Sequence, residues 1–235
     1  MGTHKFKTWR DPYDVGFSTT RAKEITINTG LTVLVGCNGA GKTTLLHNIE
    51  SELEEEGIPC LFYDNKIEST NSLGTSIFKG NFSLSATMIC SSEGENITIN
   101  LGEMVKSISD FLKTGKTKED VQKERLKNIF DGIDCVPEIS DSKERWILLD
   151  AVDSGYSIDN IIDLKHLFSL ILNDSKDMNL KTYIVVSCNE YELANGEQCF
   201  DVMNGNYITF KDYEDFKKFI LNSRAKKEKR EERLK

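Results

Sequence analysis

Residues 36–43, with the letters GCNGAGKT, combine three glycines with a lysine and a threonine at the spacing G-x-x-x-x-G-K-[ST]. Glycines let a backbone curl so that several N–H groups point at phosphate oxygens, and a following helix adds the positive end of its dipole. Lys42 would reach the β- and γ-phosphates of a nucleotide, and Thr43 would ligate Mg²⁺. We call this segment the phosphate loop. We expect the ligand to contact its residues and the next one: Gly36, Cys37, Asn38, Gly39, Ala40, Gly41, Lys42, Thr43 and Thr44.

An acidic residue, Asp150, directly follows the apolar run at 146–149. A buried strand that ends in an aspartate brings a carboxylate to the edge of a sheet, so we interpret Asp150 as the second Mg²⁺ anchor. The alternative is a capping aspartate. Ala151 comes next and cannot polarise water. We therefore hypothesise that Asp153 is the general base that activates water for hydrolysis of the nucleotide, in its own site or across a dimer. The alternative is that Asp153 caps the following helix.

The segments around these groups predict the elements that must position them. Apolar, β-branched runs predict buried strands at residues 31–36, 60–64, 146–150 and 182–187, and a hairpin at 200–210 around Asn204-Gly205. Apolar residues at helical spacing predict helices at 42–57, 96–112, 118–130, 158–172 and 212–221. Strands that alternate with helices predict an α/β fold with a mostly parallel sheet covered on both faces. The phosphate loop and Asp150 would both lie at the carboxyl ends of its strands, where ligands bind.

The letters GxNGxGKTT resemble those of the ABC-type P-loop ATPase superfamily, especially its soluble SMC-like and RecF-like branch. Further segments resemble that family in the same order along residues 25–210. SSEGE is similar to the LSGGQ signature, with Ser92, Gly94 and Glu95 at the serine, second-glycine and glutamine positions. LLDAVDSG resembles the Walker B segment, and YIVVSCNE resembles the strand that ends in the switch histidine.

This resemblance implies ATP and Mg²⁺ as ligands, held on a P-loop NTPase sheet that has helices on both faces and a C-terminal hairpin. It also implies a homodimer that closes head-to-tail around ATP, in which Ser92, Gly94 and Glu95 of one chain bind the γ-phosphate held by the other. The alternative for SSEGE is a polar loop that caps a helix. The residues with catalytic roles would be Lys42, Asp150, Asp153 and Ser92.

Three departures from the family pattern predict weak chemistry. The chain has no glutamine between the phosphate loop and SSEGE, where Asp64 or Asn65 would have to substitute. Cys188, or Asn189 in another register, stands at the position of the switch histidine, and Ala151 replaces the usual glutamate. We therefore expect a slow Mg²⁺-dependent ATPase that drives a conformational switch. The alternative is a regulatory switch that binds ATP without hydrolysing it.

Other functions fit the residues less well. A small-molecule P-loop kinase needs arginines on a lid, and Arg125 and Arg145 stand in a charged region without a lid pattern. A transporter subunit would need the missing glutamine and histidine. The aromatic residues Trp9, Tyr13 and Phe17 precede the first expected strand, where they would either stack on adenine or pack in the core.

The composition is that of an ordinary soluble chain, with 38% hydrophobic and 29% charged residues among 235. The net charge of −8 disfavours a nonspecific DNA-coating protein, so it does not indicate nucleic acid as a partner, although a local basic patch could still contact it. A protein partner is also compatible with this composition. The six cysteines form no CxxC pair, and neither a signal peptide nor a long apolar run is visible. We therefore expect a cytoplasmic protein without a membrane span.

The spacing of the motifs predicts a compact head. The stretch between the phosphate loop and SSEGE is too short for a long coiled-coil arm, and the charged residues at 113–144 lack sustained heptads. We expect one ABC-type ATP-binding domain at 1–221, with a charged helical insertion at 113–144 and a charged tail at 222–235. DNA repair, mobile-element defence or counter-defence, and regulation of a partner all fit this chain.

Overall fold

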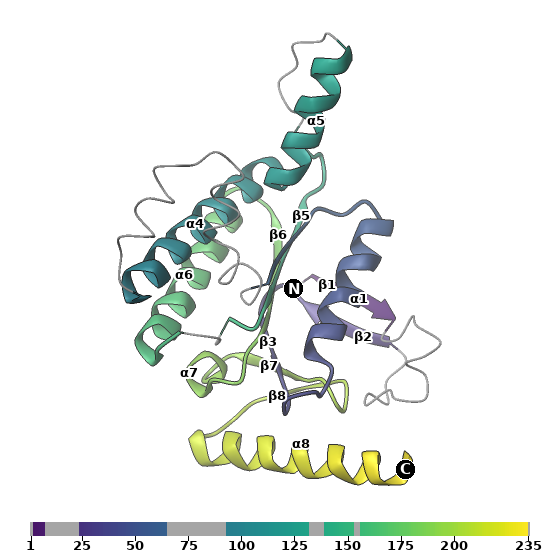
Figure 1. The fold of residues 1–235 in the computed structure, drawn as a ribbon, viewed down its shortest axis with the longest axis vertical. Coiled ribbons are helices and arrows are strands. Elements are labelled where there is room, and N and C mark those ends of the chain that lie inside the picture. The colour runs from purple at the N-terminus through teal and green to yellow at the C-terminus, as the bar shows by residue number, and fades with distance from the viewer. Residues whose placement is uncertain (1, 8–23, 65–92, 132–138, 153–155, 235) are drawn as a thin grey trace.

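The structure is a computed structural model that describes residues 2–7, 24–64, 93–131, 139–152 and 156–234 (Figure 1). Its strands are β1 (Thr3–Lys7), β2 (Glu24–Asn28), β3 (Gly30–Val35), β4 (Cys60–Asp64), β5 (Glu144–Asp150), β6 (Lys181–Ser187), β7 (Gln198–Asp201) and β8 (Asn206–Ile208). Its helices are α1 (Lys42–Glu55), α4 (Glu93–Thr114), α5 (Lys118–Asp131), α6 (Ile158–Asp177), α7 (Tyr191–Ala194) and α8 (Tyr213–Leu234). None of the described helices combines the length and the apolar character that crossing a membrane requires.

Six strands form one sheet in the order β4-β5-β6-β3-β7-β8, and β1 pairs with β2 in a separate antiparallel ribbon (Figure 1). Neighbouring strands of the large sheet are parallel, except for the antiparallel pair β7 and β8. Parallel strands that are buried on both faces need nearly continuous apolar runs, which β3, β5 and β6 have. The structure thus confirms the predicted α/β fold with a mostly parallel sheet flanked by helices.

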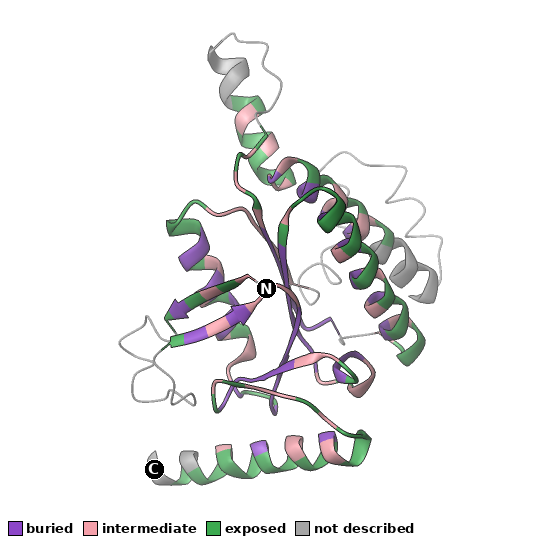
Figure 2. Cartoon of the chain, turned by 180° about the vertical axis from the view of Figure 1, so that it is seen from behind, coloured by how far each residue is buried: buried purple, intermediate pink, exposed green. Residues whose placement is uncertain are grey.

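The large sheet separates two hydrophobic cores, because successive side chains of a strand point to opposite faces. Val33 and Ile147 face the core that α4 and α6 cover. Leu34 and Trp146 face the other core, which α1, β1 and β2 cover. Figure 2 shows the strands of the sheet as a buried layer between helices whose outer faces are exposed. Packing on both faces therefore fixes the register of the strands that carry the site.

One part of the fold differs from the sequence-based expectation. The ribbon of β1 and β2 precedes residue 31, where the first strand was expected, and Phe6 is the one buried residue of β1. Helix α8 continues through residues 222–234, where the sequence indicates a charged helix end. Its second half consists mainly of lysine, glutamate, arginine and alanine, which are strong helix formers, and Arg224 pairs with Glu228 one turn later. The predicted hairpin is confirmed, since β7 and β8 pair around Asn204-Gly205.

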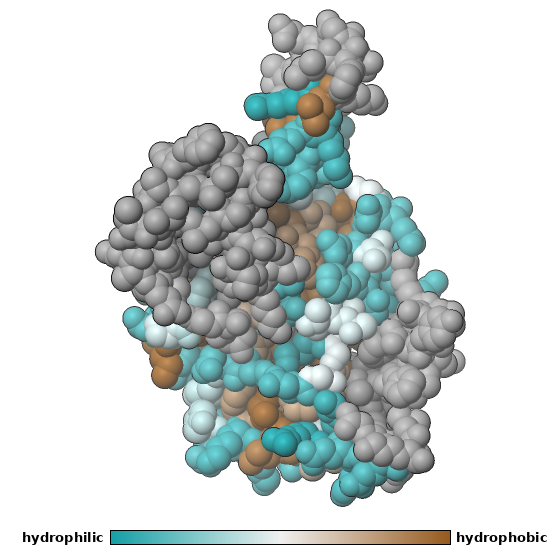
Figure 3. All heavy atoms as spheres, in the orientation of Figure 1, coloured by the Kyte–Doolittle hydropathy of each residue, from teal (hydrophilic) through white to brown (hydrophobic). Residues whose placement is uncertain are grey.

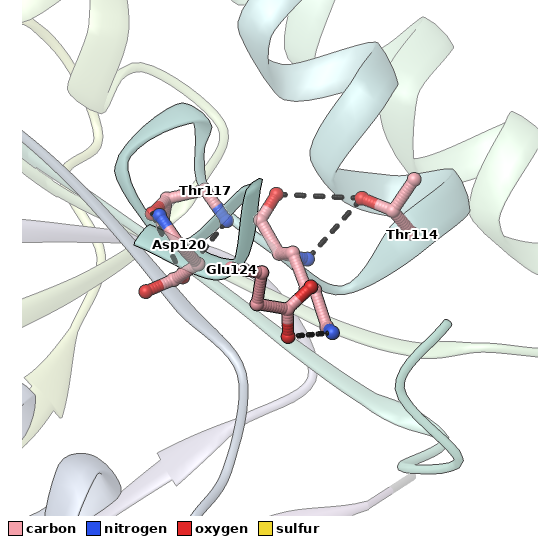
Figure 4. A network of polar contacts seen from close by, with 5 residues as sticks. Thr114, Thr117, Asp120 and Glu124 are labelled. Carbon is pink, nitrogen blue, oxygen red and sulfur yellow. Dashed lines mark hydrogen bonds and ion pairs between the residues drawn. The ribbon is translucent and has the colours of Figure 1, made fainter. Parts of the chain in front are cut away.

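Side-chain caps fix the joint between α4 and α5 (Figure 4). The Lys116 N–H donates to Thr114 Oγ1 at 3.2 Å, just beyond the end of α4. At the start of α5, the Asp120 N–H donates to Thr117 Oγ1 at 3.2 Å, and the Thr117 N–H donates to Asp120 Oδ2 at 3.0 Å. This reciprocal pair is a capping box, and Lys116 also forms an ion pair with Glu124. Helix α5 is thereby held at a defined start, on the side of the molecule far from the phosphate loop (Figure 1).

Candidate functional site

The phosphate loop joins the carboxyl end of β3 to the first turn of α1, at the edge where the parallel strands end (Figure 1). The Val202 N–H donates to the Val35 carbonyl at 3.2 Å, which ties the strand end to the β7–β8 hairpin. Within the loop, the Ala40 N–H donates to the Cys37 carbonyl at 3.0 Å. The side chains of Cys37 and Ala40 pack with Met203 in a small buried cluster. The loop is thus held in a curled conformation from within and from the hairpin.

The backbone of the phosphate loop and the start of α1 suit an anion. Gly39 and Gly41 have φ values of +74° and +96°, in the left-handed region that glycine adopts without a steric penalty. The N-cap residue of α1 is Gly41, which has no side chain to cap the helix, and no acidic residue lies in the first turn. The first N–H groups of a helix lack partners within the helix and attract negative charge. A phosphate group would satisfy them.

The Lys42 ammonium lies against the phosphate loop. Its Nζ donates to the Gly36 carbonyl at 2.8 Å, to the Cys37 carbonyl at 3.4 Å and to Asn189 Oδ1 at 3.1 Å. Hydrogen bonds to carbonyl and amide oxygens hold an ammonium in place without neutralising its charge. The structure therefore places a positive charge at the loop, where the motif predicts it.

Thr43 and Asp150 come together although 107 positions separate them in the chain. The Thr43 hydroxyl donates to Asp150 Oδ2 at 2.7 Å, and the Ala151 N–H donates to Asp150 Oδ1 at 3.0 Å. Asp150 is buried. Its partner in the strand register is Asp64, at the end of the neighbouring parallel strand β4. Among the described residues, no group of three or more His, Cys, Asp or Glu side chains would hold a metal ion. Mg²⁺ binds through one or two carboxylates together with phosphate oxygens and water, so the Thr43 hydroxyl and the Asp150 carboxylate fit it.

The chain changes direction directly after Asp150. Ala151 is buried and has a φ of +50°, in a region that costs a non-glycine residue about 1–2 kcal/mol. Its methyl group cannot accept a proton, so this position supplies no base. Asp153 and Asn65 lie outside the described residues, and the roles expected for them stay predictions.

Asn189, rather than Cys188, faces the phosphate loop from the end of β6. The Cys188 side chain is buried in the core, and its Sγ accepts a hydrogen bond from the Glu190 N–H at 3.3 Å. The Asn189 carboxamide accepts from Lys42 through Oδ1 and donates through Nδ2 to Asn38 Oδ1 at 2.9 Å. Since β6 lies between β3 and β5, its end is placed between the loop and Asp150. Of the two residues considered for the switch position, the structure brings Asn189 to the site.

The signature-like segment lies mostly beyond what the structure describes. Ser92 is outside the described residues, whereas Gly94 and Glu95 belong to the first turn of α4. Helix α4 covers the face of the sheet opposite to α1, which starts at the phosphate loop (Figure 1). The aromatic residues considered for adenine stacking are also outside the described residues: Trp9, Tyr13 and Phe17.

The two arginines considered for a kinase lid lie away from the phosphate loop. Arg145 is at the start of β5, at the opposite edge of the sheet from Asp150, and it is buried. Its guanidinium donates to the carbonyls of Ser142 and Leu112 at 2.6 and 3.3 Å, and burial lowers its pKa. Arg125 is exposed on α5, the helix farthest from the loop in Figure 1. Neither residue is placed to act on a nucleotide phosphate.

Two residues of α8 contact the phosphate loop, although the sequence indicates only a charged helix end there. The Cys37 N–H donates to Ser223 Oγ at 3.0 Å, and Lys227 Nζ donates to the Asn38 carbonyl at 3.2 Å. These contacts join segments 186 and 189 positions apart. In the sequence, the basic residues of the tail are the signal for a contact with the phosphate loop, and they do not indicate which lysine makes it.

Comparison of the chain with protein-family models, with curated proteins and with solved structures finds no match in any of the three. The chemistry of the site therefore has to be argued from its own geometry. The described residues bring together a curled glycine loop, an uncapped helix N terminus, the Lys42 ammonium and the Thr43–Asp150 pair. That set can bind a phosphate chain and a divalent cation at the same edge of the sheet.

Proposed function

We propose that this chain binds ATP with Mg²⁺ at the phosphate loop and hydrolyses it slowly as an ABC-type ATPase. The observation that carries the proposal is the meeting of three features at one strand edge. The Lys42 ammonium lies against the loop, Thr43 contacts Asp150 at 2.7 Å, and the N terminus of α1 has no described side-chain cap. A triphosphate with its cation complements this arrangement in charge and in hydrogen bonding.

Each residue of the site has a distinct part in this proposal. Backbone N–H groups of the loop and of the first turn of α1 bind phosphate oxygens, and Lys42 binds the β- and γ-phosphates. Thr43 and Asp150 hold Mg²⁺, which supplies positive charge to the phosphate oxygens when it is bound. Asn189 keeps Lys42 and Asn38 in register through its two hydrogen bonds of 3.1 and 2.9 Å.

Hydrolysis is proposed to be slow because neither Asp150 nor the residue after it is suited to act as a base. Both Asp150 oxygens accept hydrogen bonds, and Ala151 has no acidic group. Asp153 is the candidate that would activate water, and general-base help contributes about 10²–10⁴-fold to a rate. The same geometry favours a nonhydrolysing ATP-dependent switch as the second candidate function. Phosphate release by the parent protein and by Asp153→Asn distinguishes the two.

The proposal extends to assembly. Ser92, Gly94 and Glu95 would bind the γ-phosphate held by a second copy of this chain, which makes the ATP-bound form a head-to-tail homodimer. The position of α4 on the face opposite to α1 supports a role in trans. We propose that the dimer works in the cytoplasm on a protein partner. The places of Arg125 and Arg145, far from the phosphate loop, disfavour the small-molecule kinase.

The test of ATP binding is a lysine substitution with a matched control. Lys42→Ala removes a charge-assisted phosphate contact of about 1.5–3 kcal/mol, so ATP affinity should fall by about 10- to 150-fold. Lys176→Ala removes the same charge from the exposed end of α6 and should leave the affinity unchanged. Isothermal titration calorimetry with Mg²⁺ measures both. Equal ATP affinity in Lys42→Ala and in the parent protein would refute the phosphate-loop assignment.

A further inference from the structure

Helix α8 passes along the carboxyl edge of the sheet, next to the phosphate loop (Figure 1). Phe216, Ser223 and Lys227 lie on one helical face, because they are seven and four positions apart. Phe216 is buried in the core, and Phe219 and Ile220 pack against it. The first half of α8 is therefore anchored by apolar contacts. This anchor holds the following turns, which carry Ser223 and Lys227, against the loop. The described atoms along the lower rim of Figure 3, where α8 runs in Figure 1, are mostly hydrophilic.

Ser223 closes the contact between α8 and the loop. Its side chain is buried, with 4% exposed, and its Oγ accepts from the Cys37 N–H at 3.0 Å. The Ser223 hydroxyl also lies 2.9 Å from Met203 Sδ, to which it donates. A hydroxyl with both a donor and an acceptor partner is fixed in orientation. Ser223 thus sets the distance between α8 and the start of the loop.

Lys227, one turn further along α8, lies against the next peptide of the loop. Its Nζ donates to the Asn38 carbonyl at 3.2 Å. A Cβ added at Gly39 would lie only 2.5 Å from Nζ, so the ammonium is in direct contact with the backbone there. Lys227 is half-buried, whereas the neighbouring Lys229 on the same helix is exposed. Among the tail cations whose exposure the structure describes, Lys227 is the one that is half-buried.

The Asn38 carbonyl and the Gly39 N–H belong to the same peptide unit. In a planar trans peptide, the C=O and N–H bonds point in opposite directions. A cation that holds the carbonyl on one side therefore directs the N–H to the other side, and it polarises that N–H as a donor. In the motif of the phosphate loop, this N–H is one of the groups that face the phosphates.

We propose that Lys227 is a positioning residue of the phosphate site: it orients the Asn38–Gly39 peptide toward bound phosphate and adds a second positive charge to the loop. The inference rests on the proposed binding of ATP at this loop. It gives α8 a part in nucleotide binding that the sequence pattern of a solvated tail does not indicate.

The test compares ATP affinities of Lys227→Met, Lys227→Arg and Lys229→Met by calorimetry with Mg²⁺, at low and at high salt. Methionine keeps the length of the side chain but removes the charge, so Lys227→Met should bind ATP about tenfold more weakly at low salt. The loss should shrink at high salt, because a half-exposed charge is screened. Lys227→Arg should stay close to the parent protein, and Lys229→Met should match it.

Thermal unfolding without nucleotide separates this role from a purely structural one. Lys227→Met should keep a Tm within about 2 °C of the parent protein, because the lysine is only half-buried, at an edge of the fold, and methionine keeps its length. Unchanged ATP affinity in Lys227→Met would overturn the inference while leaving the proposed function intact. An equal loss in Lys229→Met, or a loss with a lowered Tm that arginine does not restore, would overturn it too. A parent protein that binds no ATP would overturn both proposals.

Discussion

At the scale of single residues, Asn189 is the side chain beyond the end of β6 that contacts both Lys42 and Asn38 of the phosphate loop. Its carboxamide accepts from the Lys42 ammonium and donates to the Asn38 side chain. A histidine or a glutamine at this place would carry a different charge or reach. The residue therefore connects the end of β6 to both sides of the loop with a neutral group.

The first prediction replaces that neutral group with a charged one of the same shape. Asn189→Asp places a carboxylate about 3 Å from the Lys42 ammonium, so an ion pair would neutralise the lysine and repel the triphosphate. ATP affinity should fall at least about tenfold, and more than in Asn189→Ala, which removes the hydrogen bonds without adding charge. Calorimetric titration of the three proteins measures this order. An aspartate variant that binds ATP as tightly as the parent protein would contradict it.

The sequence predicts the residues of the site that belong to a contiguous motif and misses those that depend on distant contacts. Lys42, Thr43 and Asp150 are found from local letters, because a glycine loop before a helix and an aspartate after a strand each leave a local pattern. The choice between Cys188 and Asn189 depends on which side chain turns inward at the end of β6. Apolar sequence patterns define the ends of strands poorly, because the side chains no longer alternate regularly between the two faces of the sheet beyond the last strand residue.

At the scale of elements, the joint between α4 and α5 depends on one glycine. Gly115 has a φ of +69°, and its N–H donates to the Phe111 carbonyl at 2.7 Å, as at the C-terminal end of many helices. A Cβ at this position would lie 2.6 Å from Ser140 Cβ and 2.9 Å from the Arg145 guanidinium carbon. The buried arginine thus fills the space that a side chain would need.

The second prediction compares two glycines of this region. Gly115→Ala should lower the free energy of unfolding by about 2–4 kcal/mol, because it combines a left-handed backbone with overpacking. Gly102→Ala, inside α4 with nothing within 4 Å of the added Cβ, should raise it by about 0.5–1 kcal/mol. Urea unfolding followed by circular dichroism measures both. A Gly115→Ala protein as stable as the parent would be inconsistent with the tight contact.

Most elements could be predicted because their apolar patterns are strong, and the exceptions have identifiable causes. The runs in β3, β5 and β6 are nearly continuous, so their strands are evident. Strand β1 has the letters THKFK with one buried residue, which is too weak a pattern to predict a strand. The docking of α8 escapes prediction because Ser223 and Lys227 are polar and contact backbone groups. No apolar periodicity marks such contacts.

At the scale of the whole molecule, the head-to-tail dimer is a prediction that rests on the resemblance of SSEGE to the signature segment. If SSEGE completes the site of a second chain, a nonhydrolysable ATP analogue should convert monomer to dimer at tens of micromolar protein. Ser92→Arg should block the conversion and spare ATP binding by the monomer. Ser169→Arg, which adds the same bulk and charge to the exposed surface of α6, should leave dimerisation unchanged.

Light scattering gives the molar mass of each protein with and without the analogue. A parent protein that stays monomeric, or a Ser92→Arg protein that dimerises normally, would contradict the composite site. Loss of dimerisation in both arginine variants would point to a general effect of added charge. These outcomes concern the assembly alone, since ATP binding by the monomer is tested separately through Lys42.

The contact between the phosphate loop and α8 also has a consequence for synthesis of the chain. Cys37 and Ser223 lie 186 positions apart, and a ribosome that adds about 5–20 residues per second needs roughly 10–40 s to pass from one to the other. During that interval the nascent chain carries a phosphate loop without Ser223 and Lys227 to hold its peptides. On the proposed binding of ATP at this loop, nucleotide would stabilise the domain fully only after α8 has left the ribosome.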